Sequence, residues 1–152
     1  MSIDQRIADL GLTLPVAASP LAAYVPTVEA GGLLHVSGQL PFRDGAVVTG
    51  RCGDGADEAD AARAAELSGL MVLAQVKAAL GSLDRVARVV KLGVFVASTP
   101  DFTAQPKVAN GASELMVKVF GDIGKHARSA VGVAALPLGA VVEVDAVFAI
   151  TD

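Results

Sequence analysis

The chain has 152 residues and a mass of 15.3 kDa, enough for one domain with a buried core and too little for two ordinary domains. Hydrophobic residues make up 53% of it and charged residues only 18%, and it has a net charge of -4 with a pI of about 5.1. An acidic chain with 4% aromatic residues and no Trp lacks both the basic patch and the stacking platform used to bind nucleic acids, so we expect no nucleic-acid partner.

The first 20 residues predict an extension ahead of the main part of a single domain that spans residues 1–152. Ser2 is suited to cap a helix, and apolar residues follow it at helical spacing, which predicts a short helix over residues 3–10. Residues 14–20 are bounded by prolines and predict an extended linker. The early charges do not fit a signal peptide, so we predict that the protein is not exported by that route.

Short strands are predicted after the linker. The runs 24–29 and 33–36 are separated by a Gly-Gly turn, which indicates a β-hairpin. Pro41 has no N–H to donate to a neighbouring strand, so the second strand should end or bulge near Gly38.

Helical periodicity predicts two long helices, at about residues 59–80 and 106–120. The segment 86–97 between them is nearly all apolar, which is typical of a strand buried on both faces. A glycine-rich loop over residues 50–60 leads into the first helix and contains Cys52, which we interpret as an incidental loop thiol.

The cysteine and histidine content and the lengths of the apolar runs bear on metal binding, cellular location and membrane contact. One cysteine and two histidines, far apart in the chain, make no metal pattern, so we predict no metal site. The single cysteine excludes an intrachain disulfide framework and fits a reducing compartment, so a cytoplasmic location is expected. No apolar run is long enough to span a bilayer, so no membrane partner is expected.

The last quarter of the chain predicts two strands, 127–134 and 141–150, joined as a hairpin by a Leu-Pro-Leu-Gly turn. Arg128 and Glu143 are unusual charges in so apolar a segment. Arginine offers a planar fork of donors that grips a carboxylate, and Glu143 on the neighbouring strand could hold that fork or orient a water. A cross-strand ion pair on a solvated face, worth under about 1 kcal/mol, is the alternative, and Asp145 on the same face as Glu143 supports it.

The order of elements predicts an α+β fold in which both long helices pack on one face of a sheet. The other sheet face would then be bare and mainly apolar. Because such a face must be buried, we predict a homo-oligomer.

A set of residues spread along the chain resembles the RidA family, also called YjgF/YER057c/UK114. The resemblance covers residues 24–150, and the separations within the set match those of the family. Its members are Tyr24, the run Ser37-Gly38-Gln39-Leu40-Pro41, Asn110, the run Ala127-Arg128-Ser129, the turn Leu136-Pro137-Leu138-Gly139, and Glu143.

The resemblance implies a chorismate-mutase-like, YjgF-like mixed sheet that assembles as a homotrimer with clefts between subunits. It implies hydrolysis of reactive enamine/imine intermediates, such as 2-aminoacrylate, to a 2-keto acid and ammonia, with no cofactor. Arg128 matches the arginine that clamps the substrate carboxylate, and Glu143 matches the acid that hydrogen-bonds the attacking water. The substrate-binding residues implied in this way are Tyr24, Ser37, Asn110, Arg128 and Ser129.

The chain also departs from the family pattern. Ala130 replaces a common family cysteine, and His126 stands where a proline often precedes the Ala-Arg pair. Residues 1–20 and the longer 50–60 loop are additions that resemble a distinct branch, and the loop could cap the cleft. The alternative to catalysis is a non-catalytic trimer that binds small carboxylates such as 2-keto acids, because a carboxylate clamp suffices for binding.

Overall fold

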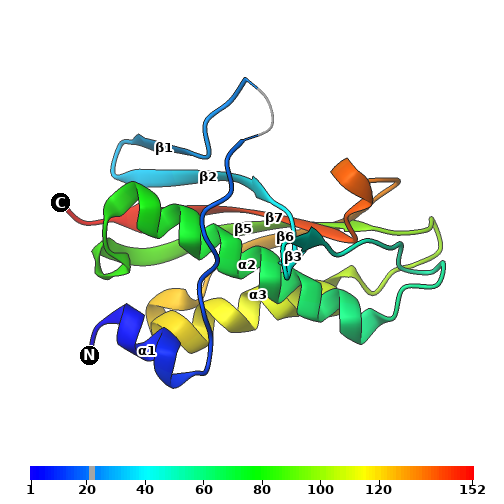
Figure 1. The fold of residues 1–152 in the computed structure, drawn as a ribbon, viewed down its shortest axis with the longest axis horizontal. Coiled ribbons are helices and arrows are strands. Elements are labelled where there is room, and N and C mark those ends of the chain that lie inside the picture. Colours follow the sequence, from blue (N-terminus) through cyan, green and yellow to red (C-terminus); the bar gives the residue numbers. More distant parts are fainter. Residues whose placement is uncertain (21–22) are drawn as a thin grey trace.

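The computed structural model describes residues 1–20 and 23–152 (Figure 1). Within these ranges a five-stranded sheet has the strand order β1-β2-β7-β5-β6, and β3 and β4 form a separate two-stranded ribbon. The strands are β1 (Thr27–Ala30), β2 (Leu33–Gln39), β3 (Phe42–Arg43), β4 (Ala46–Val47), β5 (Val86–Ala97), β6 (Ala127–Val133) and β7 (Val142–Ile150). The helices are α1 (Ile3–Asp9), α2 (Glu58–Leu80) and α3 (Gln105–Phe120), with short 3-10 turns η1 (Leu83–Arg85), η2 (Gly121–Gly124) and η3 (Pro137–Gly139).

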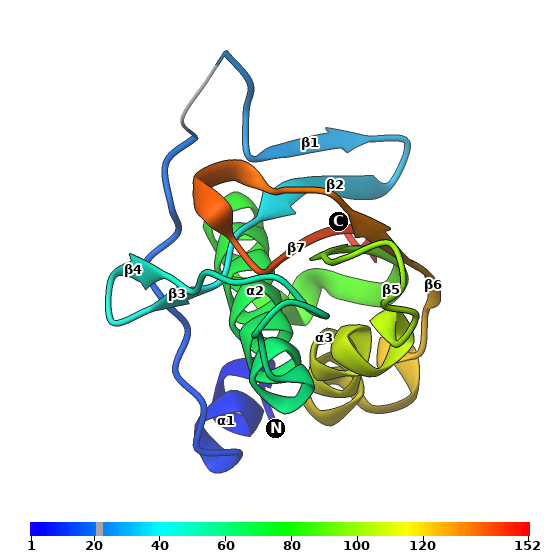
Figure 2. The ribbon, with the colours of Figure 1, turned by 90° about the vertical axis from the view of Figure 1, so that its right-hand side faces the viewer.

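Both long helices cover the same face of the five-stranded sheet, as predicted (Figure 2). Gly111 allows α2 and α3 to approach closely, because a Cβ at this position would collide with the backbone carbonyl oxygen of Ala62. The core lies between the helices and the sheet. Its largest fully buried side chains include Leu34, Leu73, Leu92, Leu115, Met116 and Phe148.

The closing strands do not form the hairpin that the Leu-Pro turn predicted. β5 lies between β6 and β7, parallel to β6 and antiparallel to β7. The physical reason is burial, because the long apolar β5 gains cover on both edges when it occupies an inner position of the sheet. Neighbouring strands are about 4.8 Å apart, so the segment after β6 needs to span only about 10 Å to pass over β5.

One other sequence-based interpretation, a strand buried on both faces at residues 86–97, needs correction for the single chain. β5 is buried on the helix side through residues such as Leu92, but Lys91 on its other side is exposed in the single chain. Cys52 lies in the 50–60 loop, where its exposed fraction is 0% and its N–H donates to the carbonyl of Ala97 at 2.8 Å. Burial, with a smaller effect from the charge of Glu58, raises the pKa of the Cys52 thiol. The 50–60 loop thus packs at the end of β5.

The β1–β2 hairpin and its irregularity agree with the sequence. β1 pairs antiparallel with β2 across the Gly-Gly turn. The pairing of β2 with β7 shifts register between Val36 and Gln39, which places a bulge at Ser37 and Gly38.

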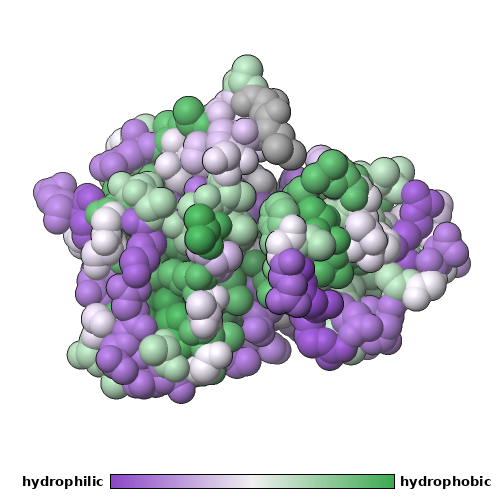
Figure 3. All heavy atoms as spheres, in the orientation of Figure 1, coloured by the Kyte–Doolittle hydropathy of each residue, from purple (hydrophilic) through white to green (hydrophobic). Residues whose placement is uncertain are grey.

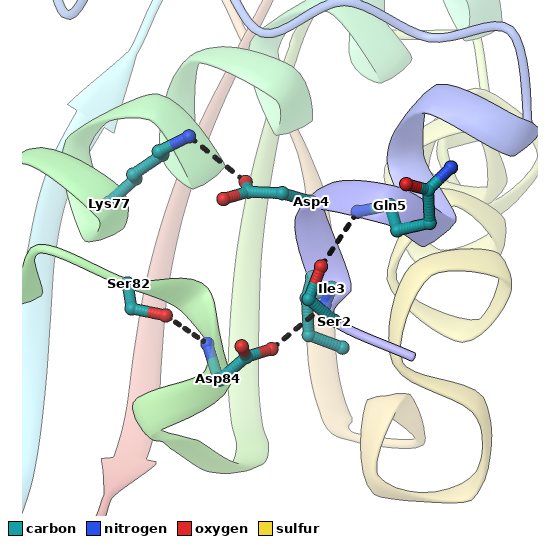
Figure 4. A network of polar contacts seen from close by, with 7 residues as sticks. All are labelled: Ser2, Ile3, Asp4, Gln5, Lys77, Ser82 and Asp84. Carbon is teal, nitrogen blue, oxygen red and sulfur yellow. Dashed lines mark hydrogen bonds and ion pairs between the residues drawn. The ribbon is translucent and has the colours of Figure 1, made fainter.

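The N-terminal extension is docked through α1 by specific contacts (Figure 4). Ser2 caps α1 by accepting a hydrogen bond from the N–H of Gln5 at 3.1 Å, as its position predicted. The N–H of Ile3 donates to the carboxylate of Asp84 at 2.8 Å, and Asp4 pairs with Lys77 at 3.0 Å. The extension is therefore joined to the last turn of α2 and to η1.

From α1 the linker crosses the outer side of α2 (Figure 1). Leu12 and Leu14 of the linker pack against the main core. Hydrophobic residues gather along this path in the space-filling view (Figure 3). This cover explains why outward-facing positions of α2 such as Met71 and Gln75 are each only 3% exposed.

None of the helices in residues 1–20 and 23–152 is long and apolar enough to cross a membrane.

Candidate functional site

Arg128 on β6 is held by two side chains of α3. Its Nη1 donates to Oδ1 of Asn110 at 2.8 Å and to Oγ of Ser113 at 3.1 Å. Asn110 and Ser113 lie three residues apart and so share one face of the helix. A guanidinium carries five N–H donors, so this cradle orients Arg128 and leaves donors for a ligand.

His126 extends the support of Arg128. Its Nδ1 lies 2.6 Å from the carbonyl oxygen of Gly124, and its Nε2 lies 2.9 Å from Oγ of Ser113. A carbonyl can only accept, so Nδ1 carries a proton and donates to it. In the tautomer with its single proton on Nδ1, Nε2 accepts from the Ser113 hydroxyl. The Ser113 oxygen then accepts a hydrogen bond from Arg128. In the series from Arg128 through Ser113 and His126 to Gly124, each donor has an acceptor.

Glu143 on β7 lies on the opposite face of the sheet. Its neighbours Val142 and Val144 are fully buried beneath the helices, and strand alternation turns Glu143 away from them. Glu143 is half-buried, and burial, followed by the nearby Asp145 carboxylate, raises the pKa of its carboxyl group. A carboxyl with a raised pKa is suited to exchange protons nearer neutral pH.

The bulge of β2 packs directly against Glu143. A Cβ at Gly38 would lie only 2.6 Å from Oε2 of Glu143, so the carboxylate occupies the space that a side chain would take. Ser37 ties the preceding segment to this place, since its Oγ donates to the carbonyl of Val25 at 2.9 Å. Tyr24 is 49% exposed and lines a cavity together with Gly38. Tyr24, Ser37 and Glu143 therefore gather on one side of the chain.

Arg128 and Glu143 do not meet within one chain. Arg128 pairs with Leu92 of β5, whose side chain is buried beneath the helices, whereas Glu143 pairs with Phe95 on the other face. Neither residue belongs to any of the ion pairs in the described ranges. The expected contact between them and the alternative cross-strand ion pair are both wrong for a single chain, because β5 separates the two strands.

The chain matches the family model described as Endoribonuclease L-PSP over residues 15–150. It belongs to this family, which is the YjgF/RidA family. The resemblance seen in the sequence is thereby confirmed.

Relatives of this RidA-family chain include proteins of different description. Protein TCP17 of Trypanosoma cruzi is 56% identical over 139 residues, covering 90% of this chain and 87% of the relative. A 2-iminobutanoate/2-iminopropanoate deaminase of Dermatophagoides farinae is 28% identical, covering 91% and 94% of the two chains. The crystal structure of Atu1372 from Agrobacterium tumefaciens, described as of unknown function, is 52% identical with a TM-score of 0.91, covering 99% and 94%.

The predicted RidA-like site residues thus divide into two groups within one chain. Arg128 and Asn110 lie together between β6 and α3, while Tyr24, Ser37 and Glu143 lie around the β2 bulge. The remaining predicted site residue, Ser129 on β6, is exposed and points to the same sheet face as Glu143. Its partner on β5 is Gly93, which pairs in turn with Asp145 of β7 on that face. The roles of these residues remain predictions.

The sequence alone did not indicate Ser113 and His126 as supports of Arg128. The available signal was the i, i+3 spacing of Asn110 and Ser113 on one helix face. In the sequence, His126 stands out only as a departure from the family pattern. Within the described ranges no group of three or more His, Cys, Asp or Glu side chains could hold a metal ion.

Proposed function

We propose that this RidA-family chain is an enamine/imine deaminase that hydrolyses 2-aminoacrylate-type intermediates to 2-keto acids and ammonia. The observation that carries the proposal is the guanidinium of Arg128, oriented by Asn110 and Ser113 with donors left over for a carboxylate. The relative named as a 2-iminobutanoate/2-iminopropanoate deaminase, at 28% identity, supports the same reaction class.

The reaction needs few protein groups. An enamine tautomerises to an imine whose C=N carbon is electrophilic, so Arg128 has only to hold the adjacent carboxylate in place. Water attacks this carbon while the Glu143 carboxylate accepts one of its protons, and this proton then passes to the nitrogen to give a carbinolamine. The remaining hydroxyl proton of the carbinolamine also passes to the nitrogen, so that ammonia can leave. The C–N bond breaks as the C=O bond forms, and one water is consumed for each 2-keto acid and ammonia released.

A complete site on this proposal requires two subunits, because Arg128 and Glu143 lie on opposite faces of one sheet. The contact would join the β6–α3 edge of one subunit to the bulge face of the next. Such a contact between unlike surfaces is head-to-tail and cannot form a two-fold dimer, and it gives a ring when the rotation between subunits closes. A homotrimer, the assembly implied by the resemblance, satisfies this geometry. Exposed apolar residues such as Val28 and Val131, at 51% and 46% in the single chain, are consistent with burial in an assembly.

The family model is described as an endoribonuclease, but we do not propose RNA as the substrate of this chain. The chain carries a net charge of -4, whereas phosphate binding draws on clustered cationic side chains. Filter binding of RNA at low salt tests this point, and tight salt-dependent retention would contradict it.

The decisive experiment generates 2-aminoacrylate in situ and follows the release of pyruvate. The wild-type protein should accelerate release, and Arg128→Ala should abolish the acceleration. No acceleration by the wild type would refute the deaminase. Calorimetric binding of 2-keto acids without turnover would instead support the non-catalytic carboxylate-binding trimer.

A further inference from the structure

A cavity of about 220 Å³ lies between the end of the N-terminal linker and the bulge of β2. Its lining is mainly apolar and comes from four separate segments of the chain. The residues that line it include Ala18, Pro20, Tyr24, Gly38, Phe42 and Leu138. Two of these, Ala18 and Pro20, belong to the N-terminal linker, near the start of the region 15–150 that matches the family model.

Two buried amides fasten the linker to the bulge. Nε2 of Gln75, on α2, donates to the carbonyl of Ala18 at 2.7 Å and to Oε1 of Gln39 at 3.3 Å. Nε2 of Gln39 donates in turn to the carbonyl of Ser37 at 2.9 Å. Gln75 and Gln39 are only 3% and 7% exposed, and buried amides are stable only when hydrogen-bonded. This chain of hydrogen bonds holds one wall of the cavity against the other.

The cavity adjoins the predicted catalytic carboxylate. Gly38 lines the cavity, and the carboxylate of Glu143 lies against the same residue. A substrate carbon placed beside Glu143 therefore has the cavity within reach of its side chain. An apolar cavity of about 150 Å³ accommodates a benzene-sized ligand, so about 220 Å³ is enough for a branched or aromatic side chain.

We infer that the N-terminal linker completes a side-chain pocket that selects imino acids, and the 2-keto acids formed from them, with apolar side chains of isobutyl to benzyl size. The inference rests on the proposed deaminase function and names its substrate class. Each buried CH₂ contributes about fourfold in affinity, so an isobutyl side chain should be favoured over a methyl group by at least about tenfold.

The test compares imines generated in situ from leucine, phenylalanine and alanine by an amino acid oxidase, with 2-keto acid release as the readout. The wild type should show a kcat/KM at least about tenfold higher for the leucine- or phenylalanine-derived imine. Ala18→Leu, which fills the cavity, should reduce this preference, while Ala17→Leu, one residue outside the lining, should keep it. Equal rates, or a preference for the alanine-derived imine, would overturn the inference and leave the deaminase standing.

A failure of the proposed function gives a different result, because no imine of any size would then be hydrolysed. In that case calorimetry with pyruvate, 4-methyl-2-oxopentanoate and phenylpyruvate tests the pocket by itself. Binding of the two larger acids at least about tenfold more tightly than pyruvate would support the pocket. Equal or absent binding would overturn it. Both measurements use the wild-type chain, so the inference can be refuted even if Ala18→Leu does not fold.

Discussion

The side chains of Arg128 and Glu143 lie on opposite faces of the same sheet, on two strands that are separated by β5. Arg128 faces α3, where Asn110 accepts its hydrogen bond at 2.8 Å, and Glu143 lies on the sheet face opposite α2 and α3. Any site that uses both residues must therefore be assembled from two chains.

Replacement of Arg128 by lysine tests the need for the guanidinium fork. Lys keeps the charge but cannot bind Asn110, Ser113 and a carboxylate in the same planar arrangement. We expect kcat/KM for 2-aminoacrylate to fall by about 10- to 100-fold, the effect of losing one hydrogen bond to a charged group. A Lys variant with wild-type kcat/KM would show that charge alone is sufficient.

Ser113→Ala tests the support of Arg128 from α3. The change removes one acceptor for the guanidinium and the hydroxyl partner of His126. We expect about a 2- to 12-fold loss in the affinity for 2-keto acids measured by calorimetry. Glu114→Ala, an exposed change at the next position of the same helix, is the control and should leave affinity unaltered. An equal loss in both variants would point to a general effect on α3.

Gly38→Ala tests the packing of the bulge against Glu143. The new Cβ would lie 2.6 Å from the carboxylate, and the flexible end of Glu143 can move aside, so the fold should persist while kcat/KM falls by about tenfold or more. Gly93→Ala is the matched control, because its Cβ would displace Asp145 on the same sheet face in the same way. A larger loss in Gly93→Ala than in Gly38→Ala would assign the acid to Asp145.

The raised pKa of Glu143 predicts a specific pH dependence. If its carboxylate accepts a proton, kcat/KM should fall as the pH drops through this raised pKa. Asp145→Asn removes the smaller of the two causes of the shift, so the acidic limb of the profile should move to lower pH without vanishing. Glu143→Gln should eliminate the limb, and an unmoved limb in Asp145→Asn would contradict the assignment.

The raised pKa of Glu143 also determines how its contribution to stability changes with pH. A carboxyl whose pKa is higher in the folded than in the unfolded chain binds more protons when folded, so its contribution is present at low pH and is lost as the pH rises through the folded pKa. Asp145→Asn should therefore raise the melting temperature more at pH 7 than at pH 4. Thermal unfolding monitored by circular dichroism checks this direction.

Ile7→Ala tests how the extension is anchored. Ile7 is 4% exposed, so its truncation should lower the free energy of unfolding by about 2–5 kcal/mol. Asp4→Asn breaks only the exposed pair with Lys77 and should cost less than about 1 kcal/mol. Denaturant titration measures both values, and a larger loss in Asp4→Asn would show that the ion pair anchors α1.

The sequence by itself determined the local structure and the family. Helical spacing predicted α1, α2 and α3 to within two residues of their ends, and the Gly-Gly turn and Pro41 predicted the β1–β2 hairpin and its bulge. These features depend on neighbouring residues, whose spacing and turn chemistry are visible in a single chain. The spaced set from Tyr24 to Glu143 was likewise sufficient to predict the family.

Only the tertiary structure decided the order of the strands and the arrangement of the site. A hairpin between β6 and β7 satisfies the same local pattern, but burial of the apolar β5 at an inner position separates them and places Arg128 and Glu143 on opposite faces. The contacts of Gln75 with Ala18 and of Arg128 with Ser113 join residues far apart in the sequence. Periodicity carries no information on such pairs, because they follow from how whole elements pack.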